Sequence, residues 1–196
     1  MENSTKTRIL NEALAMFAEK GYQGAHLREL AARLNLSKSA LYKHFDSKEA
    51  IWQGMLDQME AYYAAHFSAE HRQKAPMSRQ ELYEMTMAMI HFTVHDPRII
   101  LSRKLLLTQQ FHDERVRQLA TRHFLEGTAE RFTGIFAGMM AAGRMKKGDP
   151  ALLALAYTAP ITSLIHLCDR EPHRRPEALQ KMEAMIEYFM ETHGIL

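Results

Sequence analysis

Apolar residues recur at helical spacing along almost the whole chain of 196 residues. Ile9, Ala13 and Phe17 follow one another at one-turn intervals, and this first pattern ends at Gly21, where a left-handed turn forms easily. The chain contains no run of alternating β-branched residues and no Asn-Gly or Asp-Gly hairpin signal. We therefore predict an all-α fold of about nine helices.

Three short helices are expected near the N-terminus, followed by a longer one. The second ends before Asn35, a residue that tolerates a left-handed turn, and Ser37 can cap a third helix that ends near Phe45. Asp46 and Glu49 form an Asp-x-x-Glu variant of the capping box. This pair predicts that the fourth helix begins at Asp46.

The rest of the chain predicts a larger helical body. Ser78 and Glu81 form a second capping box, and Pro160 is expected to kink its helix. We expect a three-helix head, residues 1–47, joined by the fourth helix to a body, residues 48–196. After the fourth helix, the helices expected in the body span residues 78–95, 97–110, 113–143, 150–168 and 176–193.

The amino-acid composition limits the cellular compartment and the binding partners that can be expected for this chain. The single cysteine, Cys168, excludes an intramolecular disulfide, and the polar first residues lack the apolar core of a signal peptide, so we expect a cytoplasmic protein. We interpret the uncharged stretch 151–168 as a helix buried on several sides rather than a membrane span, because polar residues dilute it. Residues 1–50 contain eight Lys/Arg against six Asp/Glu, and residues 51–196 contain seventeen of each. The net positive charge therefore lies in the head, which favours a polyanionic partner there.

The short helix expected over residues 37–45 has one apolar and one polar face. At about 100° per residue, Leu41 and Phe45 lie close together and face inward. Ser39, Tyr42 and Lys43 then face outward. The turn between two short helices fits a helix-turn-helix, whose second helix enters the major groove of DNA. Residue types alone leave open the alternative that this is a solvated face of a three-helix bundle.

The segment Thr5–Trp52 resembles the N-terminal DNA-binding domain of the TetR family of bacterial transcriptional regulators. The resemblance is carried by Leu41–Tyr42, then His44–Phe45, then Ser47–Lys48–Glu49, and it covers about a quarter of the chain. It implies a helix-turn-helix DNA-binding domain over 1–47 that contacts double-stranded operator DNA as part of a homodimer. The residues at positions that commonly contact DNA in this family are Arg28, Ser37, Lys38, Ser39, Tyr42, Lys43, His44 and Lys48.

Two features depart from the family pattern. The chain has Ala25 and His26 where family members often have Thr or Ser, and Asn35 and Ser39 where they often have Gly. His26 is a weaker N-cap than threonine, so the start of the second helix is expected to be looser, unless His26 itself approaches a phosphate.

The resemblance implies that the body holds an effector pocket and that its last two helices form a dimer interface. The apolar surface of these two helices exceeds what two helices need within one monomer, which also favours a four-helix interface. The fourteen Met residues suit an adaptable apolar pocket, although such residues more often form an ordinary core. The residues expected to line the pocket are Met87, Ile90, His91, Phe92, Val94, Phe124, Phe136, Met139 and Tyr157. The residues expected at the dimer interface are Leu152, Leu155, Ile161, Leu164, Leu179, Met182, Met185, Ile186, Phe189 and Met190.

The main rival pattern is a pair of histidines, His91 and His95, one helical turn apart and next to Asp96. Such a pair can bind a metal, but the chain lacks His-Glu-x-x-His, a Cys cluster and a Gly-x-Ser-x-Gly elbow. We therefore predict no metal site, cofactor or catalytic residue. The sequence predicts a ligand-responsive repressor that releases its operator on binding a small apolar or aromatic effector. The alternative is a metal-binding or enzymatic helical protein that uses the body pocket.

Overall fold

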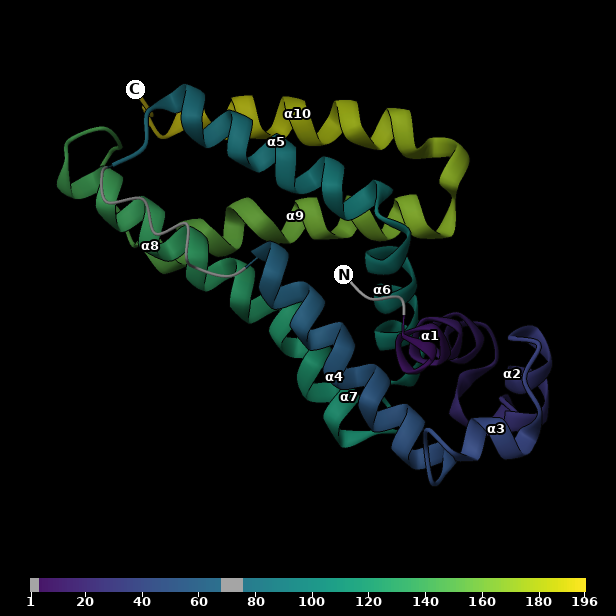
Figure 1. Ribbon diagram of the computed structural model, residues 1–196. Helices are drawn as coiled ribbons and strands as arrows, with labels where there is room; N and C mark the ends of the chain where they lie inside the picture. The colour runs from purple at the N-terminus through teal and green to yellow at the C-terminus, as the bar shows by residue number, and fades with distance from the viewer. Residues whose placement is uncertain (1–3, 68–75) are drawn as a thin grey trace. The chain divides into compact units, whose positions relative to one another are not determined.

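The computed structural model describes residues 4–67 and 76–196, and the regular structure in these residues is helical throughout, as predicted. The chain packs into two compact units (Figure 1). The first unit comprises Met1–Ser68 and Leu101–Arg117, and the second comprises Ala69–Ile100 and Gln118–Leu196. The helices are α1 (Thr5–Gly24), α2 (Leu27–Arg33), α3 (Lys38–Tyr42), α4 (Lys48–Phe67), α5 (Arg79–His95), α6 (Pro97–Gln109), α7 (Glu114–Thr121), η2 (Arg122–Glu126), α8 (Gly127–Ala141), α9 (Pro150–Arg170), η3 (Pro172–Arg174) and α10 (Arg175–Thr192).

Two helix starts follow the local signals in the sequence. Ser37 caps α3 by accepting the backbone N–H of Ala40 at 3.1 Å, and Ser78 caps α5 by accepting that of Glu81 at 3.2 Å. The Glu81 carboxylate in turn accepts the N–H of Ser78 at 2.7 Å, which completes the predicted capping box. Both predictions are confirmed, because such caps depend only on residues three apart.

The start of α4 differs from the prediction. Ser47, and not Asp46, caps this helix: its Oγ accepts the N–H of Ala50 at 3.0 Å. Glu49 instead accepts a hydrogen bond from the Tyr22 hydroxyl at 2.8 Å. The predicted Asp46–Glu49 capping box is therefore wrong, because Ser47 offers an equivalent cap one residue later and Glu49 takes a tertiary partner.

The helix predicted over residues 113–143 contains a π turn, η2. α7 ends at Thr121, and α8 begins at Gly127 after the wider turn Arg122–Glu126. A π turn contains an extra residue and so rotates the face that α8 buries relative to that of α7. A Cβ atom at Gly127 would lie 3.1 Å from the carbonyl oxygen of Arg122, so this turn favours glycine.

Aromatic side chains hold α1 against α4 in the first unit. The rings of Phe17 and Trp52 meet edge to face at 5.0 Å between centroids, and the ring of Tyr22 lies 5.1 Å from that of Trp52. These rings adjoin a buried set contributed by α1 to α4. Its largest members include Ile9, Met16, Leu30, Leu41, Ile51, Met55 and Leu56.

Side-chain hydrogen bonds fasten the segment 101–117 to α1 and α4 within the first unit. The Trp52 indole N–H donates to Asp113 Oδ2 at 3.0 Å, and Gln109 Oε1 accepts the backbone N–H of Tyr22 at 3.3 Å. The Arg115 guanidinium bonds to three side chains of α4, those of Gln53 at 2.6 Å, Asp57 at 2.5 Å and Glu60 at 2.7 Å. These bonds connect positions far apart in the sequence.

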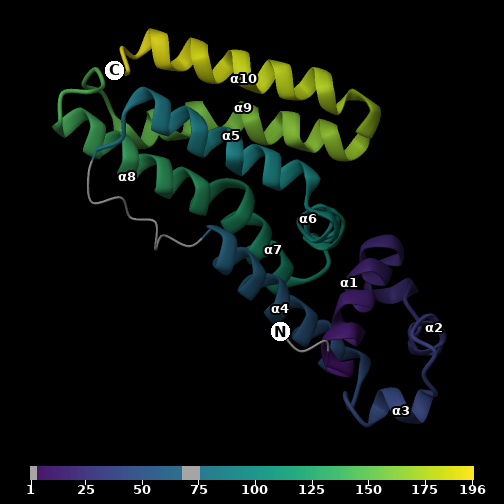
Figure 2. The ribbon, with the colours of Figure 1, turned by 45° about the horizontal axis from the view of Figure 1, so that its top comes forward.

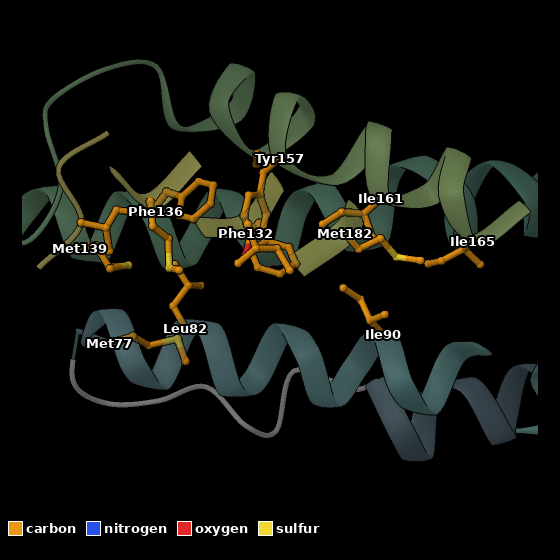
Figure 3. Packing of buried hydrophobic residues seen from close by; sticks show 14 of the residues in the cluster. Met77, Leu82, Ile90, Phe132, Phe136, Met139, Tyr157, Ile161, Ile165 and Met182 are labelled. Carbon is orange, nitrogen blue, oxygen red and sulfur yellow. The ribbon is translucent and has the colours of Figure 1, made fainter. Parts of the chain in front are cut away.

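The second unit packs α5, α9 and α10 side by side, with α8 against α9 (Figures 1 and 2). At its centre the rings of Phe132, Phe136 and Tyr157 lie 4.9 to 5.8 Å apart between centroids, and they point toward one another in Figure 3. The Tyr157 hydroxyl donates to Thr86 Oγ1 at 3.0 Å, so the buried hydroxyl is hydrogen-bonded. Other core members are Leu82, Ile90, Val94, Met139, Ile161, Met182, Ile186 and Met190.

α9 is the one helix in the described part of the chain whose length and composition would allow it to cross a membrane. It packs against α5, α8 and α10, and its face with Ala154, Tyr157 and Ile161 is buried. Only 28% of its most apolar window is buried, however, and the opposite side carries exposed Leu152 and Leu155. In the single chain, α9 is therefore buried on one face and not on several sides as the sequence predicted.

Alkaline pH is expected to destabilise the second unit through Tyr157. Burial raises the pKa of Tyr157 from 10.0 to about 12, while its hydrogen bond to Thr86 has a smaller opposite effect. Because the pKa is higher in the folded state, the contribution of neutral Tyr157 to the free energy of unfolding is fully present below pH ~10. The free energy of unfolding then falls by about 2–3 kcal/mol as the pH rises toward ~12. Urea unfolding between pH ~8 and ~11.5 measures the effect. Tyr157→Phe is expected to lose less stability over this range than the wild type, and an equal loss in both proteins would contradict the assignment.

Candidate nucleic-acid interface

α3 presents the polar side that its sequence predicts. Leu41 and Phe45 are buried, whereas Ser39, Tyr42 and Lys43 are exposed. α3 ends at Tyr42 and is shorter than the expected 37–45, yet the N–H of Phe45 still donates to the carbonyl of Leu41 at 3.2 Å. The two predicted faces are therefore confirmed. We call the exposed side chains of Ser39, Tyr42, Lys43 and His44 the α3 face.

The turn before α3 is built on Asn35. Its φ is +56°, and the next N–H, that of Leu36, donates to the carbonyl of Ala31 at 2.9 Å and so closes the end of α2. Asparagine adopts this conformation at low cost, so the turn forms without the glycine that is frequent in the family. Ser39, the second departure, places its Oγ 2.9 Å from that of Ser37.

Three more predicted DNA-contact residues are exposed near this turn. Ser37 and Lys38 lie at the start of α3, and Arg28 lies on α2. The ammonium of Lys38 lies 5.6 Å from the centroid of the Tyr42 ring. Its side chain therefore bends toward the α3 face, although its position on the helical wheel is close to that of buried Leu41.

Lys48 is held differently from the other predicted contacts. It is half-buried, and its Nζ lies 4.5 Å from the centroid of the Tyr22 ring. Burial lowers the pKa of the Lys48 ammonium. The Tyr22 hydroxyl bonds to Glu49, so the ring under the cation is itself fixed. Sequence reasoning missed Tyr22 as a positioning residue, because no local pattern connects it to Lys48.

Ion pairs hold α2 against α1. Arg33 binds Glu19 at 2.9 Å and Glu29 at 2.8 Å, and Lys20 also binds Glu29 at 2.7 Å. The hydrogen bonds from Lys20 and Arg33 lower the pKa of the Glu29 carboxyl. His26, the N-cap residue of α2, makes no side-chain cap bond. These ion pairs restrain a helix whose own cap is weak.

The residues predicted to line an effector pocket lie in or around the core of the second unit. Met87 packs against this core, Phe92 is half-buried and His91 is exposed. The ring of Phe124 meets that of His166 edge-on at 5.2 Å between centroids. The other five, Ile90, Val94, Phe136, Met139 and Tyr157, belong to the packed core. The pocket itself stays a prediction.

The two histidines of the predicted rival site stack at 5.7 Å between ring centroids, and Nδ1 of His95 lies 2.9 Å from the carbonyl oxygen of His91. Within residues 4–67 and 76–196, no group of three or more His, Cys, Asp or Glu side chains is placed to hold a metal ion. The described residues thus supply no third ligand for this pair.

The residues predicted at a dimer interface separate into three groups by burial. Four fill the core of the second unit: Ile161, Met182, Ile186 and Met190. Three are partly buried against it: Leu164, Leu179 and Phe189. The remaining three, Leu152, Leu155 and Met185, are exposed in the single chain. The sequence did not single out Tyr188, which is 72% exposed on α10.

The first unit has known relatives in sequence. A family model described as "Bacterial regulatory proteins, tetR family" matches residues 9–55. The biofilm operon icaADBC HTH-type negative transcriptional regulator IcaR of Staphylococcus aureus (strain Newman) is 44% identical over 48 residues, which are 24% of this chain and 26% of that protein. IcaR of Staphylococcus epidermidis is 34% identical over 58 residues, 30% of this chain and 31% of that protein. The match thus spans about a quarter to a third of these curated relatives.

The whole chain is similar in fold to solved structures. A TetR-family transcriptional regulator from Mesorhizobium loti superposes with a TM-score of 0.72 at 20% identity, covering 98% of this chain and 100% of that one. SmeT, the repressor of the Stenotrophomonas maltophilia multidrug efflux pump SmeDEF, superposes with a TM-score of 0.68 at 18% identity, covering 97% of this chain and 91% of that one. A transcriptional regulator from Saccharomonospora viridis, in complex with choline, gives 0.72 at 18% identity over 97% of each chain. Residues 9–55, which contain the helix-turn-helix, therefore match the tetR family of bacterial regulatory proteins, and the whole chain has the fold of these solved regulators.

Proposed function

We propose that this protein is a homodimeric DNA-binding repressor whose affinity for its operator is controlled by a small effector. The observation that carries the proposal is the α3 face, where Tyr42 and Lys43 are exposed while Leu41 and Phe45 anchor the helix. A short helix anchored on one side and polar on the other can enter the major groove with its outer residues against DNA. Such a protein acts in the cytoplasm.

The contacts expected at DNA divide by chemistry. Lys43 and Lys48 are suited to phosphates, and the Tyr42 hydroxyl can donate to a phosphate oxygen. These contacts position the protein without reading sequence. Ser39 is small enough to allow close approach to base edges. Named relatives of the first unit are negative regulators, which supports repression rather than activation.

A salt titration tests DNA binding directly. The affinity for a fluorescently labelled duplex is expected to fall by about 10³-fold or more between about 50 and 200 mM salt, because each neutralised phosphate releases counterions. Fluorescence anisotropy measures the affinity. A helical interaction module that does not bind DNA would show no affinity for the duplex at low salt, and that result would reject the proposal.

The dimer is proposed to form through α9 and α10. These antiparallel helices join at η3, and apolar side chains are exposed on both of them: Leu152 and Leu155 on α9, and Met185 and Tyr188 on α10. Apolar side chains exposed along both helices favour a second copy of the hairpin as the partner. A two-fold dimer would present two α3 helices to half-sites about 34 Å apart, one turn of DNA.

Leu152→Asp is expected to shift the protein from dimer to monomer at micromolar concentration. Leu152 is 63% exposed in the single chain, so the substitution is compatible with the fold, but an unpaired carboxylate buried in an interface costs several kcal/mol. Analytical ultracentrifugation measures the change. Leu125→Asp is the matched control, because Leu125 is 50% exposed on η2, which is not part of the α9–α10 hairpin. A dimer that survives Leu152→Asp would contradict the proposed interface.

The effector is proposed to be a small apolar or aromatic molecule that binds in the body, residues 48–196. The ring cluster around Phe132, Phe136 and Tyr157 gives this region the chemistry for such a ligand. Repression is released if the effector favours a spacing of the two heads, residues 1–47, that does not match adjacent major grooves. A Tyr42→Phe/Lys43→Ala variant distinguishes this function from the alternative of an enzyme or metal protein. It is expected to lose DNA binding, whereas an enzymatic or metal-binding activity in the body would survive.

A further inference from the structure

Lys6 lies on α1, yet its ammonium reaches the end of the helix-turn-helix. Its Nζ lies 5.2 Å from the centroid of the Phe45 ring. Phe45 directly follows Tyr42, Lys43 and His44, whose side chains are exposed on the α3 face. A cation from the first turn of α1 is therefore placed against the anchoring residue that follows the α3 face in the chain.

The surroundings of Lys6 favour an anion. The first turn of α1, Thr5–Arg8, contains two basic residues and no acidic one. Ser4 caps this helix by accepting the N–H of Thr7 at 3.2 Å, and its carbonyl accepts that of Arg8 at 3.0 Å. The backbone N–H groups of Thr5 and Lys6 have no acceptor within the helix, as at every helix start, and they add to the positive potential there.

The contact with Phe45 leaves Lys6 able to bind a second group. An ammonium has three N–H donors, and the face of one ring cannot accept all of them. Lys6 is exposed, so its remaining donors are available to an anion from solvent. The ring restrains the side chain without neutralising its charge, because a cation–π contact involves no carboxylate.

Building on the proposed DNA-binding function, we propose that Lys6 is a further DNA contact, whose ammonium binds a backbone phosphate next to the α3 face. Lys48 packs on Tyr22, near the opposite end of α1, so the two lysines meet the duplex backbone at separate places. A second phosphate contact fixes the angle at which α3 enters the groove. It orients the protein and carries no sequence preference of its own.

The test measures salt dependence with a fluorescein-labelled duplex of mixed sequence and about 30 base pairs, long enough for two half-sites one turn apart. Four full-length proteins are compared: the wild type, Lys6→Gln, Lys6→Arg and the control Lys147→Gln. Lys147 is an exposed lysine between α8 and α9 in the second unit. In Lys6→Gln, the slope of log affinity against log salt is expected to be shallower by about 0.9 for each bound protomer. Lys6→Arg and Lys147→Gln are expected to keep the wild-type slope.

Each outcome supports or overturns the proposed contact between Lys6 and a phosphate. A wild-type slope in Lys6→Gln overturns this contact alone. A shallower slope in Lys6→Arg or Lys147→Gln also overturns it, because the salt dependence would then not follow the charge at residue 6. A wild type that does not bind the duplex overturns the proposed function together with this inference. The slope stays informative even if a variant is partly unfolded, because a constant folded fraction changes the apparent affinity and not its salt dependence.

Discussion

A protein carrying Tyr42→Phe and Lys43→Ala is expected to lose duplex binding while keeping its fold. Both side chains are exposed on the α3 face. In the proposed complex, each forms a hydrogen bond to a phosphate. Bonds to a charged group contribute about 1.5–3 kcal/mol each, so losing both lowers the affinity by at least about 100-fold. Phenylalanine keeps the ring over which the Lys38 ammonium lies. Fluorescence anisotropy at fixed low salt measures the loss.

Two controls make this result specific. Lys104→Ala removes an exposed lysine from α6 in the same unit and is expected to bind the duplex as the wild type does, within about threefold. The unfolding free energy of the double variant should stay within about 0.5 kcal/mol of wild type, because it changes only exposed positions. Duplex binding by the folded double variant at wild-type affinity would exclude α3 as the recognition helix.

Trp52→Ala is expected to cause the largest loss of stability in the first unit, about 3–5 kcal/mol. The indole is 1% exposed, packs against the rings of Phe17 and Tyr22, and donates its N–H to Asp113 at 3.0 Å. Removing it leaves a cavity between α1 and α4 and leaves Asp113 without this donor. Since small proteins are stable by about 5–15 kcal/mol, this change removes a large share of the total. Urea unfolding followed by circular dichroism measures it.

The contributions of the Trp52 ring and of its hydrogen bond to the stability of the first unit can be separated. Trp52→Phe keeps an aromatic ring and loses the hydrogen bond to Asp113, so we expect a smaller cost of about 1–3 kcal/mol. Phe111→Ala is the matched control, because Phe111 is an aromatic residue of the same unit that is 83% exposed, and it should change stability by no more than about 0.5 kcal/mol. Equal stability of Trp52→Ala and Phe111→Ala would show that the ring cluster does not support the first unit.

The two faces of α3 and the caps of α3 and α5 could be predicted because they depend on residues within one or two turns. The inward position of Leu41 and Phe45 follows from helical geometry, and the caps at Ser37 and Ser78 follow from their own side chains. The same reasoning failed at Asp46, where Ser47 competes as a cap. Local signals predict that a helix starts, but two adjacent caps of similar strength leave its first residue undetermined.

The local sequence pattern could not predict which apolar side chains of α9 and α10 are exposed. Met182 and Ile186 belong to the same apolar stripe as Met185, yet the first two fill the core and Met185 is exposed. Periodicity identifies an apolar stripe, but the neighbouring helices decide which part of it is covered. The π turn at η2 adds to this, because its extra residue shifts the buried face of α8 in a way that a regular 3.6-residue period does not anticipate.

By itself, the sequence determined the all-helical fold, the helix-turn-helix and the residues on the α3 face, because each of these depends on spacing along one stretch of chain. Only the tertiary structure decided which distant residues pack around the helix-turn-helix. Tyr22 lies under Lys48, Lys6 lies against Phe45, and Asp113 accepts the indole of Trp52. These contacts join helices whose relative placement is set by the packing of a shared core, and no sequence period records which side chains that packing brings together.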